Sequence, residues 1–170
     1  MAIELPVSAF LTDWVRRLVD DEAAVQSALE TPVLVWEGDL ADAHWVAKTP
    51  EHAPSPENPV VFLVKKVEGR PNPFGGGVTL GRAEHNDVVF PHASVSRFHA
   101  YLSPDPTQIS RWTVVDAASR NGTLLNGTPL QPNTAAPMGS ATRVNVGEMH
   151  LTFLSPPAFL RWLMKVVEAV

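Results

Sequence analysis

The 170-residue sequence contains no cysteine. This absence excludes disulfide bonds, thiolate catalysis and cysteine-bound zinc or iron–sulfur centres, and it fits a reducing compartment. The sequence also lacks an apolar run of the roughly 18–20 residues that a membrane span requires, and residues 1–4 lack the basic-then-apolar order of a secretion signal. We therefore expect a cytoplasmic protein with no membrane partner.

An excess of basic residues is also missing, because 18 acidic and 13 basic side chains give a formal charge of −5. A nucleic-acid binder needs a broadly basic surface, so we expect no nucleic-acid partner. The acidity is unevenly distributed. Residues 1–57 carry 11 acidic and 3 basic side chains, whereas residues 58–170 carry 7 acidic and 10 basic ones. A local basic site is therefore compatible with the acidic whole.

Proline, with 16 residues, marks where the chain changes character, and four prolines fall within residues 49–59. Such a stretch holds neither a helix nor a central strand, so we interpret it as a linker. We therefore predict an acidic N-terminal helical extension with its linker over residues 1–57, a domain over residues 58–155 and a C-terminal helix over residues 156–170.

Helical patterns lie at both ends of the chain. Apolar side chains recur at three- and four-residue spacing over residues 7–19, which predicts an amphipathic helix with Ser8 as its N-cap and an extension to Glu30. Residues 32–36 then predict a short buried strand or another extended segment. A second helix is predicted after Ser155, because a serine cap followed by proline is a typical helix start.

Between these helices, short runs rich in β-branched and aromatic residues alternate with clusters of Gly, Pro, Asn and Asp. Many short strands at this spacing predict a β-sandwich. The predicted strands are residues 60–64, 78–80, 88–90, 98–102, 111–115 and 149–154.

Polar clusters occupy the loops between the predicted strands. They are Gly81-Arg82 with Asn86-Asp87, then Ser96-Arg97-Phe98-His99, then Ser119-Arg120-Asn121-Gly122-Thr123 with Asn126-Gly127 shortly after. Each cluster is weak alone, since Asn-Gly is a common hairpin turn, but their order is specific. In this order the sequence resembles the forkhead-associated (FHA) domain, and the resemblance covers about residues 60–155.

The resemblance implies an FHA-type β-sandwich of about eleven strands, and therefore a mainly β protein with helical additions at both ends. It also implies a phosphothreonine-binding adaptor without catalysis in Ser/Thr kinase signalling. The partner would be a phosphothreonine-containing protein or peptide, with a Ser/Thr kinase upstream. The alternative is a phosphorylation-independent scaffold subunit of a larger assembly that uses the same fold.

The motif residues suit these implied roles. The planar Arg82 fork can hold two phosphate oxygens at once, and the Ser96 hydroxyl can donate to a third. Asn121 suits the peptide backbone, the role that the resemblance implies for it. The candidate phosphopeptide-binding residues are Arg82, Ser96, Arg97, Arg120, Asn121 and Gly122. The candidate structural residues of the motif are Gly81, Asn86, Asp87, His99, Asn126 and Gly127.

Two arginines have alternative roles. Arg82 could instead pair with a nearby carboxylate, Glu84 or Asp87. Arg120 stands where many family members have a small hydroxyl residue, so it could contact phosphate or lie in solvent.

We predict no catalytic or metal-binding role for the histidines. A regular strand would point Ser96 and His99 to opposite sides, so we place His99 in the interior, where the resemblance implies a loop-bracing role. His85 and His92 lie on the predicted binding loops, and we expect them to be exposed, with contact to a bound peptide as the alternative. The six histidines show no metal-ligand spacing, so we expect neither a metal nor another cofactor.

Enzyme chemistry is disfavoured. Ser96, His99 and Asp116 supply the residue types of a hydrolase triad, but the sequence has no Gly-x-Ser-x-Gly elbow. Residues 75–77 are three glycines without the Lys-Ser/Thr of a nucleotide-binding loop. We therefore expect a protein that is not an enzyme.

The N-terminal extension has three possible roles. Its helix could pack beside the sandwich and bury Phe10 and Trp14 against aromatic residues of the C-terminal helix. It could instead form a docking or dimerisation surface. A third possibility is that Thr31 or Thr49 is phosphorylated and then bound by the domain of the same chain.

Overall fold

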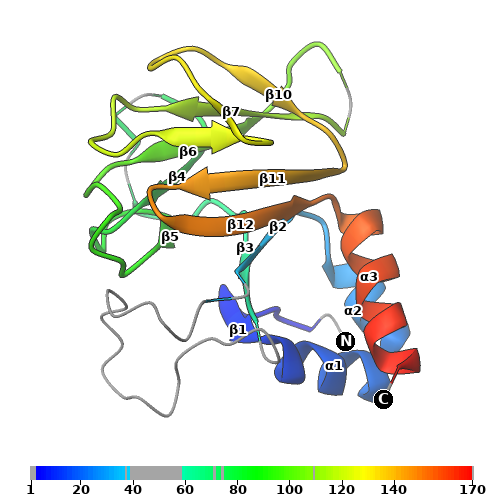
Figure 1. Ribbon diagram of the computed structural model, residues 1–170. Helices are drawn as coiled ribbons and strands as arrows, with labels where there is room; N and C mark the ends of the chain where they lie inside the picture. The colour runs from blue at the N-terminus through cyan, green and yellow to red at the C-terminus, as the bar shows by residue number, and fades with distance from the viewer. Residues whose placement is uncertain are drawn as a thin grey trace.

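The computed structural model describes residues 3–36, 38, 59–70, 72–73, 75–108 and 110–169. These residues contain twelve strands in two sheets and three helices that pack beside the larger sheet (Figure 1). The protein is therefore mainly β, as the sequence predicts. Thr49 and most of the predicted linker lie outside the described residues.

The larger sheet has seven strands in the order β1-β3-β2-β12-β11-β8-β9, and all neighbours are antiparallel. Its strands are β1 (Ser8–Phe10), β2 (Val33–Trp36), β3 (Val60–Leu63), β8 (Thr123–Leu125), β9 (Thr128–Pro129), β11 (Ala141–Val146) and β12 (Met149–Leu154). The smaller sheet has the order β10-β7-β6-β4-β5, with β4 and β5 parallel. Its strands are β4 (Val78–Gly81), β5 (Val88–Val89), β6 (Ala100–Pro104), β7 (Trp112–Asp116) and β10 (Ala136–Met138).

Apolar side chains from both sheets form the core between them. In β11, the alternate residues Thr142, Val144 and Val146 are buried, which follows from the two-residue period of a strand. Phe62 of β3 meets Phe90 edge to face, with ring centroids 5.0 Å apart. This interior supports the ends of the strands from which the candidate loops extend.

The N-terminal part of the chain contributes a strand inside the larger sheet. β2 lies between β3 and β12 and is buried on both faces. Leu34 and Trp36 face the sandwich core, whereas Val33 and Val35 face the helices. The larger sheet therefore combines strands from the acidic part of the chain before residue 57 with strands from the basic part after it.

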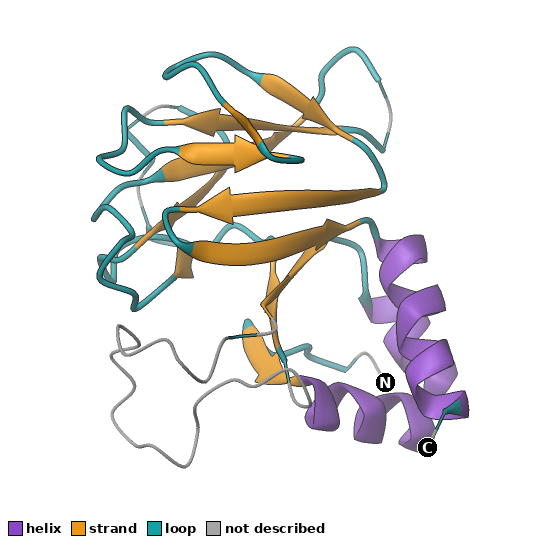
Figure 2. Cartoon of the chain, viewed as in Figure 1, coloured by secondary structure: helices purple, strands orange, loops and turns teal. Residues whose placement is uncertain are grey.

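The three helices pack together on the outer side of this sheet (Figure 2). They are α1 (Leu11–Asp20), α2 (Glu22–Ala28) and α3 (Pro156–Glu168). Trp14 is fully buried and meets Phe159 edge to face at 5.1 Å, as expected, whereas Phe10 packs against the sandwich core instead. Ser155 caps α3, as predicted. No helix in the described part of the chain is long and apolar enough to cross a membrane.

The start of the chain differs from the predicted single helix. Ser8 is not an N-cap, because it lies in β1 opposite Phe62 and the helix begins only at Leu11. The predicted extension to Glu30 is interrupted at Asp21, whose backbone is not helical and whose side chain accepts a hydrogen bond from Ala24 N–H at 2.9 Å. Asp21 therefore caps a second helix, α2.

Candidate functional site

Four loops meet at one end of the sandwich, and hydrogen bonds join them. Arg82, after β4, donates its backbone N–H to the Ser96 carbonyl at 3.0 Å. Arg120, after β7, donates its backbone N–H to Ser96 Oγ at 3.0 Å. Glu148, in the turn after β11, donates its backbone N–H to Ser94 Oγ at 2.8 Å. The candidate residues of distant segments are thereby brought into one cluster.

Arg82 is exposed, and its guanidinium is oriented by the neighbouring loop. Its Nε donates to the Val95 carbonyl at 3.0 Å, which leaves the two terminal nitrogens without a partner among the described residues. Neither Glu84 nor Asp87 forms an ion pair with Arg82 among the described residues. Asp87 is bound instead by Lys66 Nζ at 2.8 Å. The fork is therefore available to hold an anion with two hydrogen bonds.

The Ser96 hydroxyl has its proton available for a ligand. Its oxygen accepts the Arg120 backbone N–H, and a hydroxyl has one proton besides its two lone pairs. Within the described residues, this hydroxyl makes no hydrogen bond to His99, which contacts the Ser96 backbone instead. The nucleophile-to-base contact of a hydrolase triad is thus not formed by this pair.

The Asn121 side chain is held so that its oxygen is available. Its Nδ2 donates to the Ser94 carbonyl at 2.8 Å, and its oxygen has no partner within the described ranges. An amide oxygen in this position suits the N–H of an extended peptide. The next residue, Gly122, has a φ of 81°, a left-handed conformation that glycine adopts without strain.

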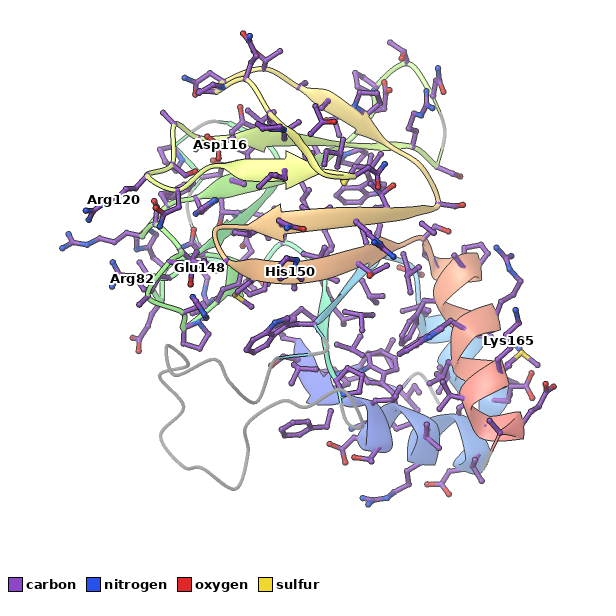
Figure 3. The ribbon with its side chains drawn as sticks, viewed as in Figure 1. Arg82, Asp116, Arg120, Glu148, His150 and Lys165 are labelled. Carbon is purple, nitrogen blue, oxygen red and sulfur yellow. The ribbon has the colours of Figure 1, made fainter. Side chains whose placement is uncertain are left out.

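These side chains line a pocket of about 180 Å³. Its lining residues are Arg82, Ala93, Ser94, Val95, Ser96, Arg97, Arg120 and Asn121. Arg82 and Arg120 project from the same edge of the molecule (Figure 3). The pocket holds three arginines and no carboxylate, and none of the three forms an ion pair within the described part of the chain. A larger cavity of about 830 Å³ beside α1, β1 and β3 shares no residue with it.

His99 is fully buried and connects two of the loops. Its Nδ1 accepts the Ser96 backbone N–H at 3.0 Å, and its Nε2 donates to the Gly122 carbonyl at 2.9 Å. Burial lowers the pKa of His99, although the Gly122 carbonyl and Asp116 partly oppose this shift. The ring is therefore neutral at pH 7. His99 lies in the interior as predicted, but Ser96 and His99 do not belong to a regular strand, because β6 begins only at Ala100.

The other motif residues support the loop after β4. The Asn86 side chain donates to the Arg97 carbonyl at 2.6 Å, and Asp87 accepts the Thr79 backbone N–H at 2.8 Å. Gly81 lies so close to the next loop that an added Cβ would be 2.2 Å from the Arg97 oxygen. These contacts hold Arg82 in place beside Ser96.

The Asn126-Gly127 pair forms the two-residue turn between β8 and β9 and does not line the pocket. Both residues have positive φ values, 49° and 82°, as this hairpin type requires. The Asn126 side-chain oxygen accepts the Arg143 backbone N–H at 3.1 Å. This pair therefore stabilises the sheet at a distance from the pocket.

Asp116 positions the loop after β7, a role that the sequence analysis missed. It is 2 % exposed, and its Oδ1 accepts hydrogen bonds from Ser119 Oγ at 2.6 Å and from Thr123 Oγ1 at 2.7 Å. These bonds fix both ends of the turn that contains Arg120 and Asn121. The available signal is an aspartate three residues before a serine in a loop, a common side-chain-to-backbone turn pattern.

Ser94 was also missed, and the prediction for His92 is wrong. His92 is fully buried. Its Nδ1 accepts the Ser94 backbone N–H at 3.1 Å and lies 2.8 Å from Ser94 Oγ. His85 is exposed, as predicted, and its ring lies 5.6 Å from that of Phe98. Within the described ranges, no three His, Asp or Glu side chains are grouped to hold a metal ion.

Residues 78–147 match the sequence model of the family described as the FHA domain. The chain is 39% identical over 80 residues to an ABC transporter ATP-binding/permease protein of Mycobacterium tuberculosis, which covers 46% of this chain and 8% of that protein. It is 32% identical over 80 residues to an oxoglutarate dehydrogenase inhibitor of Corynebacterium glutamicum, with 47% and 52% covered. The chain thus spans about half or less of the length of these curated relatives.

Among solved structures, a crystal structure of the MEK1 FHA domain is similar, with a TM-score of 0.49 and 19% identity over 80% of this chain and 98% of that one. The family match includes all three polar clusters of the sequence, from Gly81 to Thr123. It confirms the resemblance that those clusters indicated.

Proposed function

Since residues 78–147 of this chain form an FHA domain, we propose that the protein binds phosphothreonine-containing proteins or peptides in Ser/Thr kinase signalling and catalyses no reaction. The observation that carries this proposal is the free Arg82 fork beside the Ser96 hydroxyl, in a pocket that contains no carboxylate. A phosphothreonine brings about −1.5 to −2 charges and three acceptor oxygens to such a pocket.

The donors and acceptors match the ligand in kind. The guanidinium of Arg82 offers two parallel N–H groups to phosphate oxygens, which a lysine ammonium cannot reproduce. Ser96 supplies a hydroxyl donor, and the Asn121 oxygen can accept a backbone N–H of the bound peptide. Arg97 and Arg120 add positive charge at the rim. We therefore propose that the phosphopeptide is bound by Arg82, Ser96, Arg97, Arg120, Asn121 and Gly122.

The same geometry supports binding without catalysis. Both ring nitrogens of His99 are hydrogen-bonded to backbone groups, so the ring has no lone pair to accept the Ser96 proton. We place the protein in the cytoplasm, where a cysteine-free phosphoprotein reader can meet kinase products, and propose no cofactor. We propose neither a nucleic acid nor a membrane as a partner.

The test is a titration of the purified protein with a degenerate phosphothreonine peptide library, measured by fluorescence anisotropy. Phosphoserine and unphosphorylated versions of the library are the comparison ligands. We expect binding of the phosphothreonine library only. Equal binding of all three libraries would instead support the phosphorylation-independent scaffold.

A variant pair locates the phosphate. We expect Arg82→Ala to cost about 2–5 kcal/mol of affinity, the usual cost of removing one partner of a hydrogen-bonded charge pair. Arg161→Ala is the matched control, because Arg161 is an exposed arginine on α3 outside the pocket. Full binding by Arg82→Ala would place the phosphate elsewhere.

A further inference from the structure

We propose that the site selects peptides with a second anionic group near the phosphothreonine, and that Arg120 binds this second group. The inference rests on the proposed function, which it refines by naming the class of peptide. The second group is a carboxylate or another phosphate, since both offer the paired oxygens that an arginine fork recognises.

The charge of the pocket exceeds that of one phosphothreonine. Arg82, Arg97 and Arg120 give the lining a formal charge of +3, whereas a phosphothreonine brings at most about −2. No carboxylate lines the pocket, and neither Glu84 nor Glu148 of the same loops forms an ion pair with any of the three arginines among the described residues.

The hydrogen bonds indicate which arginine is left for the second group. Arg82 and Ser96 are bonded through their backbones, and Arg97 directly follows Ser96, so these three belong to one pair of adjoining loops. Two arginines and a hydroxyl are sufficient to neutralise and hold one phosphate dianion. Arg120 comes from the separate loop after β7, beyond the Ser96 hydroxyl.

The Arg120 side chain is also free to reach a flanking residue of the ligand. It is exposed and makes no hydrogen bond or ion pair within the described ranges, whereas its backbone N–H is fixed on Ser96 Oγ. The Arg120 backbone is therefore held beside the Ser96 hydroxyl, while its guanidinium is left available at the rim of the pocket. Arg120 and Arg82 lie at the same edge of the sandwich, as the shared pocket requires (Figure 3).

The experiment compares three phosphothreonine peptide libraries by fluorescence anisotropy at low salt. The first has degenerate flanks without acidic residues. The second carries one aspartate, and the third one phosphoserine, moved through each flanking position. For the unmodified protein we expect at least one flanking position to strengthen binding about two- to fivefold, the effect of a charge-assisted contact at an exposed site. This advantage should shrink as salt is added.

Arg120→Gln removes one positive charge from the pocket, so all three libraries should bind somewhat more weakly. The advantage of the second and third libraries over the first should fall to about onefold. The melting temperature of Arg120→Gln should match that of the parent, because the side chain has no partner among the described residues. Arg161→Gln is the control and should keep the full advantage. The aspartate and phosphoserine arms distinguish an acidic flank from a second phosphorylation.

Two results would overturn the inference and leave the proposed function standing. The first is equal binding of the three phosphothreonine libraries by the unmodified protein. The second is that Arg120→Gln keeps the stronger binding of the aspartate and phosphoserine libraries, whether or not Arg97→Gln removes it. Failure of every phosphothreonine library to bind would instead refute the proposed function itself, and the inference with it.

Discussion

The buried ring of His99 accepts a hydrogen bond from the backbone N–H of Ser96 at 3.0 Å. The other ring nitrogen donates to the Gly122 carbonyl at 2.9 Å. One neutral imidazole thus joins the loop that presents the Ser96 hydroxyl to the loop that presents Asn121. The geometry of the candidate site depends on this ring, although the ring itself does not line the pocket.

Replacing this ring should therefore destabilise the protein. His99→Ala leaves the Ser96 N–H and the Gly122 carbonyl without their partner, so we expect a loss of about 2–4 kcal/mol in the free energy of unfolding. Urea denaturation measures this loss. The control is His150→Ala, which removes an exposed histidine and should cost less than about 0.5 kcal/mol. Equal stability of His99→Ala and the parent would show that the ring is not a brace.

The same ring should make stability depend on pH. Burial lowers the pKa of His99 below its ordinary value of 6.5. The unfolded chain therefore takes up this proton first as the pH falls, and the stabilising contribution, complete above pH 6.5, is lost progressively below it. We expect the free energy of unfolding to fall between pH 7 and 5 more steeply in the parent than in His99→Gln. Parallel pH profiles would contradict this expectation.

Gly81 should not tolerate a side chain. A Cβ there would lie 2.2 Å from the Arg97 oxygen and 2.6 Å from Asn86 Nδ2. Gly81→Ala must therefore separate the loop after β4 from the loop that contains Ser96, and we expect a loss of about 3 kcal/mol with weaker phosphopeptide binding. Gly76→Ala is the control, because nothing lies within 4 Å of an added Cβ. The prediction fails if both variants melt at the parent temperature.

The buried carboxylate of Asp87 should contribute stability above its pKa. Burial alone would raise this pKa, but the hydrogen bonds from Lys66 and from the backbone of Thr79 and Val67 lower it below 3.8. The contribution should therefore be complete above pH 3.8 and disappear as the pH falls further.

Asp87→Ala should cost about 3–5 kcal/mol at pH 7, because it leaves buried donors unpaired. Lys66→Met is the comparison. The Lys66 side chain is 43 % exposed, so its removal should cost clearly less. A larger loss for Lys66→Met in chemical denaturation would reverse this assignment.

Asp116 should affect binding through the loop that it positions. Asp116→Asn weakens the hydrogen bonds from Ser119 and Thr123, so we expect phosphopeptide affinity to fall about tenfold, equivalent to one lost hydrogen bond to a charged group. Asp105→Asn is the matched control, since the partly exposed Asp105 accepts similar bonds from Thr107 outside the pocket. Equal affinity of both variants would show that Asp116 does not position the site.

The structure also bears on Thr31 as a ligand for the domain of its own chain. Thr31 precedes β2, whose first residue, Val33, pairs with Leu154 at the end of β12. The pocket adjoins the turn before the opposite end of β12, where Met149 begins the strand. A six-residue strand spans about 20 Å. Capture of a phosphorylated Thr31 is therefore expected only between two molecules.

Much of the fold was predictable because its signals are local. Alternating apolar residues indicated the strands of the sandwich, Asn126-Gly127 indicated a hairpin, and Ser155 indicated the start of α3. Each of these patterns acts over a few residues. The first strand was missed for the same reason. Phe10 continues the apolar spacing of the following helix and Ser8 resembles its N-cap, while their actual partner, β3, lies far along the chain.

The sequence by itself determined several β-rich segments along the chain, the chemical types in the loops and the excess of positive charge after residue 57. Only the tertiary structure decided that Asp87 pairs with Lys66, that His92 is buried, and that Arg82 and Arg120 share a pocket without a carboxylate. Those outcomes depend on contacts between segments about 20 or more residues apart, such as Arg120 on Ser96. Local periodicity does not encode such contacts, because they form only when the two sheets pack and bring the ends of their strands together.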